Sequence, residues 1–250
     1  MKIVISMCTV DRPGKTYLGD TVRDLIEKGV PASAIHLFPT TPDVAWLDAQ
    51  LRSLAIQRHV PDVPCHRNAN GLRQVSVLDH VDADWLLMLE DDIRVCQDFL
   101  GSVERWVADH ARPEVPFYRL LTLGASRSDP VYGTPKGLAK DGAQAWSNWE
   151  VRGAQAVLIR ADLAREFHAW GSTNREHFRP KMAPYQTRWA DGFDKMIGYW
   201  ARETRPGSTH MVAMPNLVLH VGVVSSLHSR GERNDPQFNA RPYLGRQVIA

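Results

Sequence analysis

Apolar and polar positions change their spacing repeatedly along the chain. Short runs that are almost entirely apolar alternate with longer segments in which apolar residues recur every three or four positions. The first pattern predicts strands buried on both faces, and the second predicts amphipathic helices. The predicted strands are 2–8, 34–38, 85–89, 117–123, 154–160 and 211–220. The predicted helices are 17–28, 44–58, 71–80, 98–110, 161–170 and 191–203. This alternation indicates an α/β fold with a mixed, mostly parallel sheet flanked by helices.

Turn-forming residues mark the connections between these elements. The first strand runs into a turn-rich loop over 9–14, and Gly29 ends the first helix. The segment 124–142 is rich in Gly, Ser and Pro and predicts a surface loop or lid. Residues 171–188 are expected to be irregular, and the polar, Arg-rich residues from 225 onward to be loop-like.

The strand at 85–89 ends in three consecutive carboxylates, Glu90, Asp91 and Asp92. Adjacent carboxylates repel one another unless a positive group lies among them. A divalent metal ion is the simplest such group, and it takes oxygen ligands. The alternative is a solvated acidic turn that caps the helix beginning near residue 98. The buried strand in front of the carboxylates favours the metal site.

Composition fits an ordinary enzyme. The 250 residues are 44% hydrophobic, so we expect a single domain over residues 1–250. The net charge of +2 does not by itself indicate a polyanion-binding surface. Only seven of the thirty basic residues are Lys. The excess of Arg is compatible with phosphate-bearing ligands, and a GC-rich genome would produce it too.

The cysteines and the apolar runs indicate the cellular compartment of the protein. The three cysteines are scattered and form no CxxC pair, so neither a disulfide framework nor a zinc site is indicated. The sequence has no evident charged leader and no run of eighteen apolar residues. We therefore expect a cytoplasmic protein without a membrane span.

Three strand ends together resemble a known enzyme class. The first strand ends in Thr9-x-x-Arg12, a central strand in Glu-Asp-Asp, and a late strand in the segment PNLVLHVGVVSSL at 215–227. The chain thereby resembles the GT-A class of nucleotide-sugar glycosyltransferases. Within that class it is most similar to the N-acetylglucosaminyltransferase IV family, whose members carry Leu-Glu-Asp-Asp and a later Pro-Ser-Leu-x-x-His-Val-Gly-x-x-Ser-Ser-Leu. The similarity extends from about residue 84 to residue 227; the family's membrane anchor and lumenal stem are not expected in this chain.

The resemblance implies a GT-A fold and an inverting transfer of a sugar, hexosyl or N-acetylhexosaminyl, from a UDP-linked donor to a hydroxyl acceptor. Residues 1–110 would then form the nucleotide-sugar-binding half and 111–250 the acceptor-binding half. The leaving diphosphate gains charge as the glycosidic bond breaks, so a cation that bridges both phosphates is expected. Mg²⁺ or Mn²⁺ suits oxygen ligands, and Mn²⁺ also accepts an imidazole.

Six residues are expected to hold the metal and the donor's ribose, base and diphosphate. Asp92 would ligate the metal, and His220 would complete its coordination from the opposite side of the cleft; alternatively, His220 is an ordinary polar residue at a strand end. Glu90 and Asp91 would hold ribose hydroxyls or metal-bound waters. Arg12, together with Thr9 in the same loop, would contact the base and diphosphate, unless the loop is merely polar.

Further candidates surround this centre. Asn70 or Arg73 would touch the base or phosphates, unless residues 68–73 only form a turn that opens the next helix. Asp191 is the first candidate for the base that accepts the acceptor's proton, with a helix N-cap as the alternative, and Asp194 is the second. Acceptor contacts are expected from an aromatic segment in which core packing is equally compatible with the sequence, namely Trp146, Trp149 and Glu150.

Other functions remain open. A metal-dependent phosphohydrolase would use strand-end acids together with further Asp and His ligands, which are not evident in the sequence. An inactive sugar-nucleotide-binding protein would keep the fold but lose acids that are present here. The acceptor would be a glycan, a lipid-linked precursor, a small molecule or a protein. Alternatively it would be a hydroxylated base in DNA, since an Arg-rich chain has the side chains that nucleic-acid binding requires.

Overall fold

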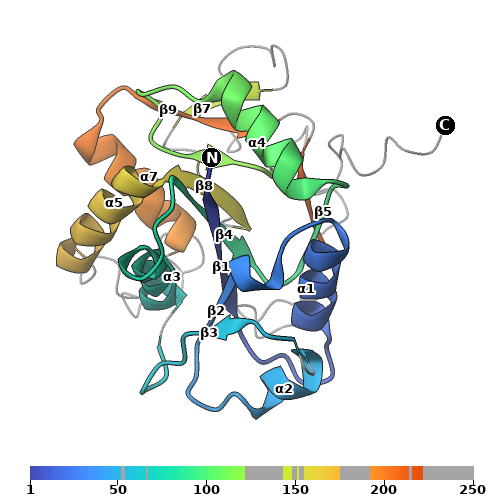
Figure 1. Ribbon diagram of the computed structural model, residues 1–250. Coiled ribbons are helices and arrows are strands. Elements are labelled where there is room, and N and C mark those ends of the chain that lie inside the picture. Colours follow the sequence, from blue (N-terminus) through green and yellow to red (C-terminus); the bar gives the residue numbers. More distant parts are fainter. Residues whose placement is uncertain are drawn as a thin grey trace, which may run out of the picture.

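The computed structural model describes residues 1–51, 54–65, 67–121, 143–147, 151, 155–174, 192–213 and 216–221. An eight-stranded sheet forms its centre, in the order β3-β2-β1-β4-β8-β6-β9-β7 (Figure 1). Its strands are β1 (Ile3–Thr9), β2 (Ile35–Pro39), β3 (Gln57–Arg58), β4 (Trp85–Glu90), β6 (Tyr118–Arg119), β7 (Ala143–Ser147), β8 (Ala156–Arg160) and β9 (Thr209–Ala213). A separate two-stranded ribbon pairs β5 (Ile93–Val95) with β10 (Val218–His220).

The large sheet is mixed. Strand β1 runs parallel to both β2 and β4, and β2 is parallel to β3. Strand β8 is antiparallel to β4 and β6, while β9 is parallel to β6 and antiparallel to β7. The predicted fold class, a mixed and mostly parallel sheet flanked by helices, is confirmed. Because β1 and β4 are parallel neighbours, their carboxyl ends lie at the same edge of the sheet.

Helices cover both faces of the sheet (Figure 1). One apolar core unites α1 (Tyr17–Glu27), α2 (Ala45–Leu51) and α4 (Phe99–His110) with one face. The other core unites α3 (Arg67–Val75), α5 (Ala161–Asn174) and α7 (Phe193–Thr204) with the opposite face. Apolar cover on both sides accounts for the continuous apolar sequences of β1 and β4. None of the described helices is long and apolar enough to cross a membrane.

Several predicted boundaries in the first half of the chain are corrected. The helix predicted over 44–58 ends at Leu51, and Gln57–Arg58 form an edge strand beside β2. The helix predicted over 71–80 begins at residue 67 and ends in a 3-10 turn, η2 (Ser76–Asp79). Residues 68–73 are therefore helical and not a turn. A second 3-10 turn, η1 (Ala32–Ala34), precedes β2. Gly29, with φ at +91°, follows the end of α1 as predicted.

The second half of the chain also differs in detail from the predicted pattern. The strand predicted over 211–220 is two strands, β9 in the large sheet and β10 in the ribbon. Within the strand predicted over 117–123, the described residues 117–121 form a strand at Tyr118–Arg119, and residues 122–123 lie outside the described residues. Strand β7 was not predicted, and α5 continues to Asn174, four residues beyond the predicted end at 170. The predicted loop at 124–142, most of 171–188 and the residues from 225 onward lie outside the described residues.

Candidate metal centre

The acidic turn lies at the carboxyl edge of the large sheet. Glu90 is the last residue of β4 and is level with Cys8 of β1. The next two residues connect β4 to β5, and the antiparallel pairing of β10 with β5 places His220 opposite Ile93. The backbone N–H of Val221 donates to the carbonyl of Asp92 over 2.9 Å. Sheet pairing therefore brings a histidine from residue 220 beside an acidic turn that lies far earlier in the sequence.

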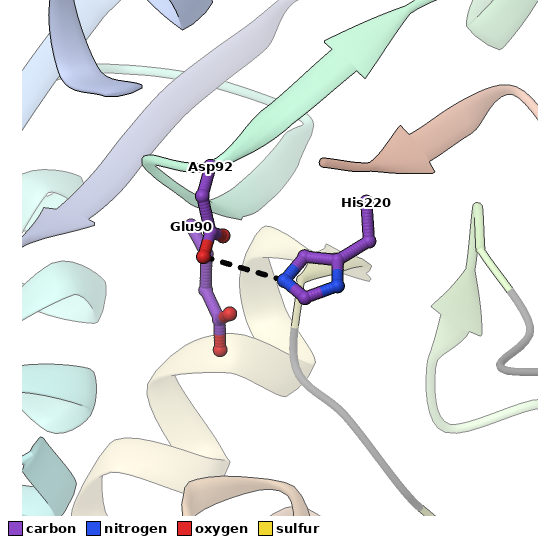
Figure 2. A group of neighbouring side chains, drawn as sticks. All are labelled: Glu90, Asp92 and His220. Atoms are coloured by element: carbon purple, nitrogen blue, oxygen red, sulfur yellow. Dashed lines mark ion pairs between the residues drawn. The ribbon is translucent and has the colours of Figure 1, made fainter. Parts of the chain in front are cut away.

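Three side chains meet at this point: Glu90, Asp92 and His220. One potential ligand atom from each lies within 4.8 Å of the other two. His220 Nε2 is 3.3 Å from Asp92 Oδ2 (Figure 2). Asp92 is 4% exposed and His220 is 7% exposed. The second carboxylate oxygen of Asp92, Oδ1, is buried and has no hydrogen-bond partner among the described residues.

The middle carboxylate, Asp91, has different surroundings. Its Oδ2 accepts hydrogen bonds from the Thr9 hydroxyl at 2.5 Å and from the Val10 backbone N–H at 3.2 Å. Its Oδ1 accepts from Arg12 Nη1 at 2.5 Å. Asp91 is 2% exposed. Its oxygens are thus bonded to the end of β1 and to the loop that follows it.

Arg12 lies between the two aspartates. Besides its bond to Asp91, its Nη2 is 3.6 Å from Asp92 Oδ2, and the guanidinium carbon lies 5.6 Å from the centre of the Tyr17 ring. Its Nε is buried with no hydrogen-bond partner among the described residues. The predicted residues Thr9 and Arg12 therefore reach the acidic turn, where both contact Asp91.

Burial and neighbouring charges shift the pKa values of this group in different directions. Burial, reinforced by the charge of Asp92, raises the pKa of Glu90 to about 8. Burial also raises the pKa of Asp91, although Arg12 and Thr9 act in the opposite sense. Burial would raise the pKa of Asp92 too, but its hydrogen bond to His220 and the charges of His220 and Arg12 lower it below the ordinary value. For His220, burial is outweighed by Asp92 and Glu90, so the imidazole pKa is raised.

The donor set fits a divalent cation. Two carboxylates and one imidazole converge, and a buried carboxylate oxygen without a partner is costly unless a cation or another donor satisfies it. Oxygen ligands suit Mg²⁺ and Mn²⁺, and the imidazole favours Mn²⁺ over Mg²⁺. Glu90, Asp92 and His220 are therefore the residues of the described chain that could hold such an ion.

The two predicted residues of α3 have protein partners. Asn70 is fully buried, and its amide donates to the carbonyl of Phe38 at 2.7 Å and to Cys8 Sγ at 3.0 Å. Arg73 Nη1 donates to Asn70 Oδ1 at 2.7 Å and to the carbonyl of Pro39 at 3.1 Å. These bonds join α3 to the ends of β1 and β2, on the side of the acidic turn where a nucleotide was expected.

The predicted base and acceptor residues are described only in part. Asp194 lies in the first turn of α7, and the N-cap of that helix is Gly192, so the helix starts two residues later than predicted. Trp146 lies on β7, level with His210 of β9. Asp191, Trp149 and Glu150 lie outside the described residues.

Sequence reasoning missed two aspects of the centre. It named Glu90 only as a contact for ribose or metal-bound water and did not anticipate that a carboxylate oxygen of Glu90 would lie within 4.8 Å of ligand atoms of Asp92 and His220. It also missed Thr21 of α1, which is buried and bonds the backbone on both sides of Asp92. A threonine inside a helix carries no sequence signal for such a role.

Comparisons with known proteins identify a fold. No family model matches the chain, and no curated protein matches it. A mannose-1-phosphate geranyltransferase from Thermus thermophilus aligns with a TM-score of 0.50 and 14% identity, over 85% of this chain and 74% of that one. S. aureus TarS aligns with a TM-score of 0.50 and 10% identity, over 89% of this chain but only 37% of TarS. At such identities the similarity shows a shared Rossmann-like α/β fold.

Proposed function

We propose that this chain is a metal-dependent inverting glycosyltransferase that moves a sugar from a nucleotide-sugar donor, UDP-linked, to a hydroxyl acceptor. The observation that carries this proposal is the convergence of Glu90, Asp92 and His220 at the carboxyl edge of a parallel β-strand pair. Open α/β sheets bind their ligands at that edge. The acidic and late motifs resemble those of the N-acetylglucosaminyltransferase IV family, and this function is what that resemblance implies.

In this proposal Asp92 and His220 hold Mn²⁺ or Mg²⁺, with Glu90 as a third ligand or as a contact for the donor's ribose. The cation would supply charge stabilisation for the diphosphate leaving group. Arg12 has a buried Nε with no partner among the described residues, and this N–H would serve the same diphosphate. Asp91 would hold Arg12 in place by the bond between their side chains.

The remaining roles follow the resemblance. Residues 1–110 would bind the donor, with Thr9, Asn70 and Arg73 near the nucleotide. Residues 111–250 would bind the acceptor, a glycan, a small molecule or a hydroxylated base in DNA. Trp146, Trp149 and Glu150 would contribute to that half, and Asp191 or Asp194 would accept the proton of the attacking hydroxyl.

A donor screen tests the proposal directly. Purified protein with Mn²⁺ is heated with a panel of nucleotide sugars, because a bound donor raises the melting temperature by mass action. We expect a UDP-sugar to stabilise the protein with Mn²⁺ and not with excess EDTA. Absence of any nucleotide-sugar effect, or an unchanged effect in EDTA, would contradict the proposal.

Turnover of two variants separates the candidate bases, and the configuration of the product tests the mechanism. Asp191→Asn and Asp194→Asn keep the side-chain shape but cannot accept a proton, so the variant at the true base should lose about two to four orders of magnitude in turnover. Donor affinity should survive in both variants. A single displacement inverts the anomeric centre, so a product that retains the donor's configuration would reject the inverting mechanism.

A further inference from the structure

Helix α1 presents three polar side chains to one strand. Thr21, Asp24 and Lys28 recur at helical spacing on and just beyond α1, and all three bond the backbone of β5. The Ile93 N–H donates to Thr21 Oγ1 at 3.2 Å, and the Val95 N–H donates to Asp24 Oδ2 at 2.7 Å. Lys28 Nζ donates to the Val95 carbonyl. The helix thus supplies the hydrogen bonds that a neighbouring strand would otherwise provide along this edge of β5.

The other edge of β5 carries the histidine strand. The Val221 N–H donates to the Asp92 carbonyl at 2.9 Å, and the Cys96 N–H donates to the Leu217 carbonyl at 3.0 Å. Alternate residues of a strand direct their backbone groups to opposite edges. Residues 93 and 95 accordingly face α1, and residues 92 and 96 face β10. The β5 strand is therefore fixed between α1 and the strand that brings His220 to the centre.

Thr21 differs from the other two residues in where it bonds. Its hydroxyl lies 2.9 Å from the carbonyl oxygens of both Asp91 and Ile93, and it accepts from the Ile93 N–H. The peptide groups on both sides of Asp92 are thus bonded to one side chain, which is 1% exposed. Asp24 bonds the same strand two residues farther from Asp92, at Val95.

We propose that Thr21 is a positioning residue that fixes the backbone around Asp92 and so aims the Asp92 carboxylate at a divalent cation shared with His220. This inference rests on the proposed function, because it takes Asp92 as a metal ligand. Groups that orient metal ligands have large effects on affinity, since a displaced ligand oxygen no longer meets the ion. Thr21 would act through its hydrogen bonds to these peptide groups and not as a ligand of the metal or the donor.

Direct measurement of Mn²⁺ binding tests this role without any assay of activity. Free Mn²⁺ is counted by electron paramagnetic resonance in titrations of wild type, Thr21→Val, Thr21→Ser and Asp24→Leu at a temperature where all are folded. Thr21→Val keeps the shape but removes the hydroxyl, so we expect roughly tenfold weaker Mn²⁺ binding. Thr21→Ser restores the hydroxyl and should bind within about threefold of wild type.

Asp24→Leu is the matched control, because it removes the analogous bond to Val95 and the ion pair with Lys28 at 2.9 Å. It should lower the melting temperature at least as much as Thr21→Val and leave the Mn²⁺ affinity within about threefold. Should Thr21→Val not fold, Thr21→Cys takes its place, because a thiol is a weak donor and acceptor.

The outcomes separate two failures. If wild type binds no Mn²⁺, the proposed function fails at its metal site. If wild type binds Mn²⁺ and the folded Thr21 variant without the hydroxyl binds it equally well, the positioning role is wrong. Equal weakening by Asp24→Leu would also overturn it, because the effect would then belong to the stability of β5 as a whole.

Discussion

Asp91 and Asp92 are neighbours in the sequence and both are buried, yet their carboxylates meet different surroundings. Asp91 accepts three hydrogen bonds, one from Thr9 at the end of β1 and two from Val10 and Arg12 in the loop that follows. Asp92 faces His220 across the β5–β10 ribbon and keeps one buried oxygen without a partner among the described residues. The satisfied carboxylate has the surroundings of a structural anchor, and the incompletely satisfied one has those of a metal ligand.

The difference comes from the backbone at the end of β4. Residues 91 and 92 form the connection between a strand of the large sheet and a strand of the ribbon, so successive side chains can face different elements. One side of this connection meets the loop after β1, and the other meets β10. Both residues are aspartates, so only their positions in the turn distinguish them.

Asp92→Ala should give the largest effect and is the strongest test of this contrast. A bound cation stabilises developing phosphate charge by several kcal/mol, which corresponds to roughly a 1,000-fold loss of turnover when the site is destroyed. Mn²⁺ binding should be lost in parallel. Steady-state kinetics and metal titration check both points, and full activity in the variant would remove Asp92 from the metal site.

Asp91→Ala should lower the stability of the fold without removing a metal ligand. The variant removes the nearest carboxylate of buried Arg12 and the acceptor of the Thr9 hydroxyl and the Val10 N–H. We expect this to cost about 3 kcal/mol in the free energy of unfolding. Urea denaturation of the metal-free protein measures this loss. Asp91→Leu combined with Arg12→Met removes both charges and should recover part of the stability. A single Asp91 variant that is as stable as wild type would show that Asp91 is not an anchor.

Much of the fold could be predicted because its central strands are buried on both faces. The sequences of β1, β4 and β8 are almost purely apolar, and each was predicted close to its observed range. Short edge elements carry no comparable pattern. The two-residue β3 and three-residue β5 are defined by hydrogen bonds to partners distant in the sequence, and such partners leave no local signal.

The site could be predicted in outline but not in detail. The sequence indicated that the acidic turn and His220 belong together, and the structure brings Glu90, Asp92 and His220 together. It could not assign Glu90 and Asp91 to different surroundings, since that depends on how the turn after β4 is oriented. Thr21 and Asp24 lie on the buried side of α1 and contact β5 only after folding, so their bonds to it were not predictable from helical spacing.

The smallest expected effect concerns Glu90 and the pH dependence of stability. In the metal-free protein, burial and the charge of Asp92 raise the pKa of Glu90 from 4.5 to about 8. Between these values the folded chain holds a proton that the unfolded chain has lost, so the free energy of unfolding falls as pH rises. Glu90→Gln removes this contribution.

The variant should therefore gain stability relative to wild type as the pH of an EDTA buffer rises from about 5 to about 8. With added Mn²⁺, wild type should be the more stable protein near pH 8, because its ionised Glu90 carboxylate can bind the cation and the amide of the variant cannot do so as strongly. Glu104→Gln, an exposed position on α4, is the matched control and should follow wild type at every pH. Melting temperatures across the series measure the difference. If Glu90→Gln also follows wild type, the carboxylate of Glu90 does not carry an extra proton in the folded protein. Only Asp92 and His220 would then differ from Asp91 in their surroundings.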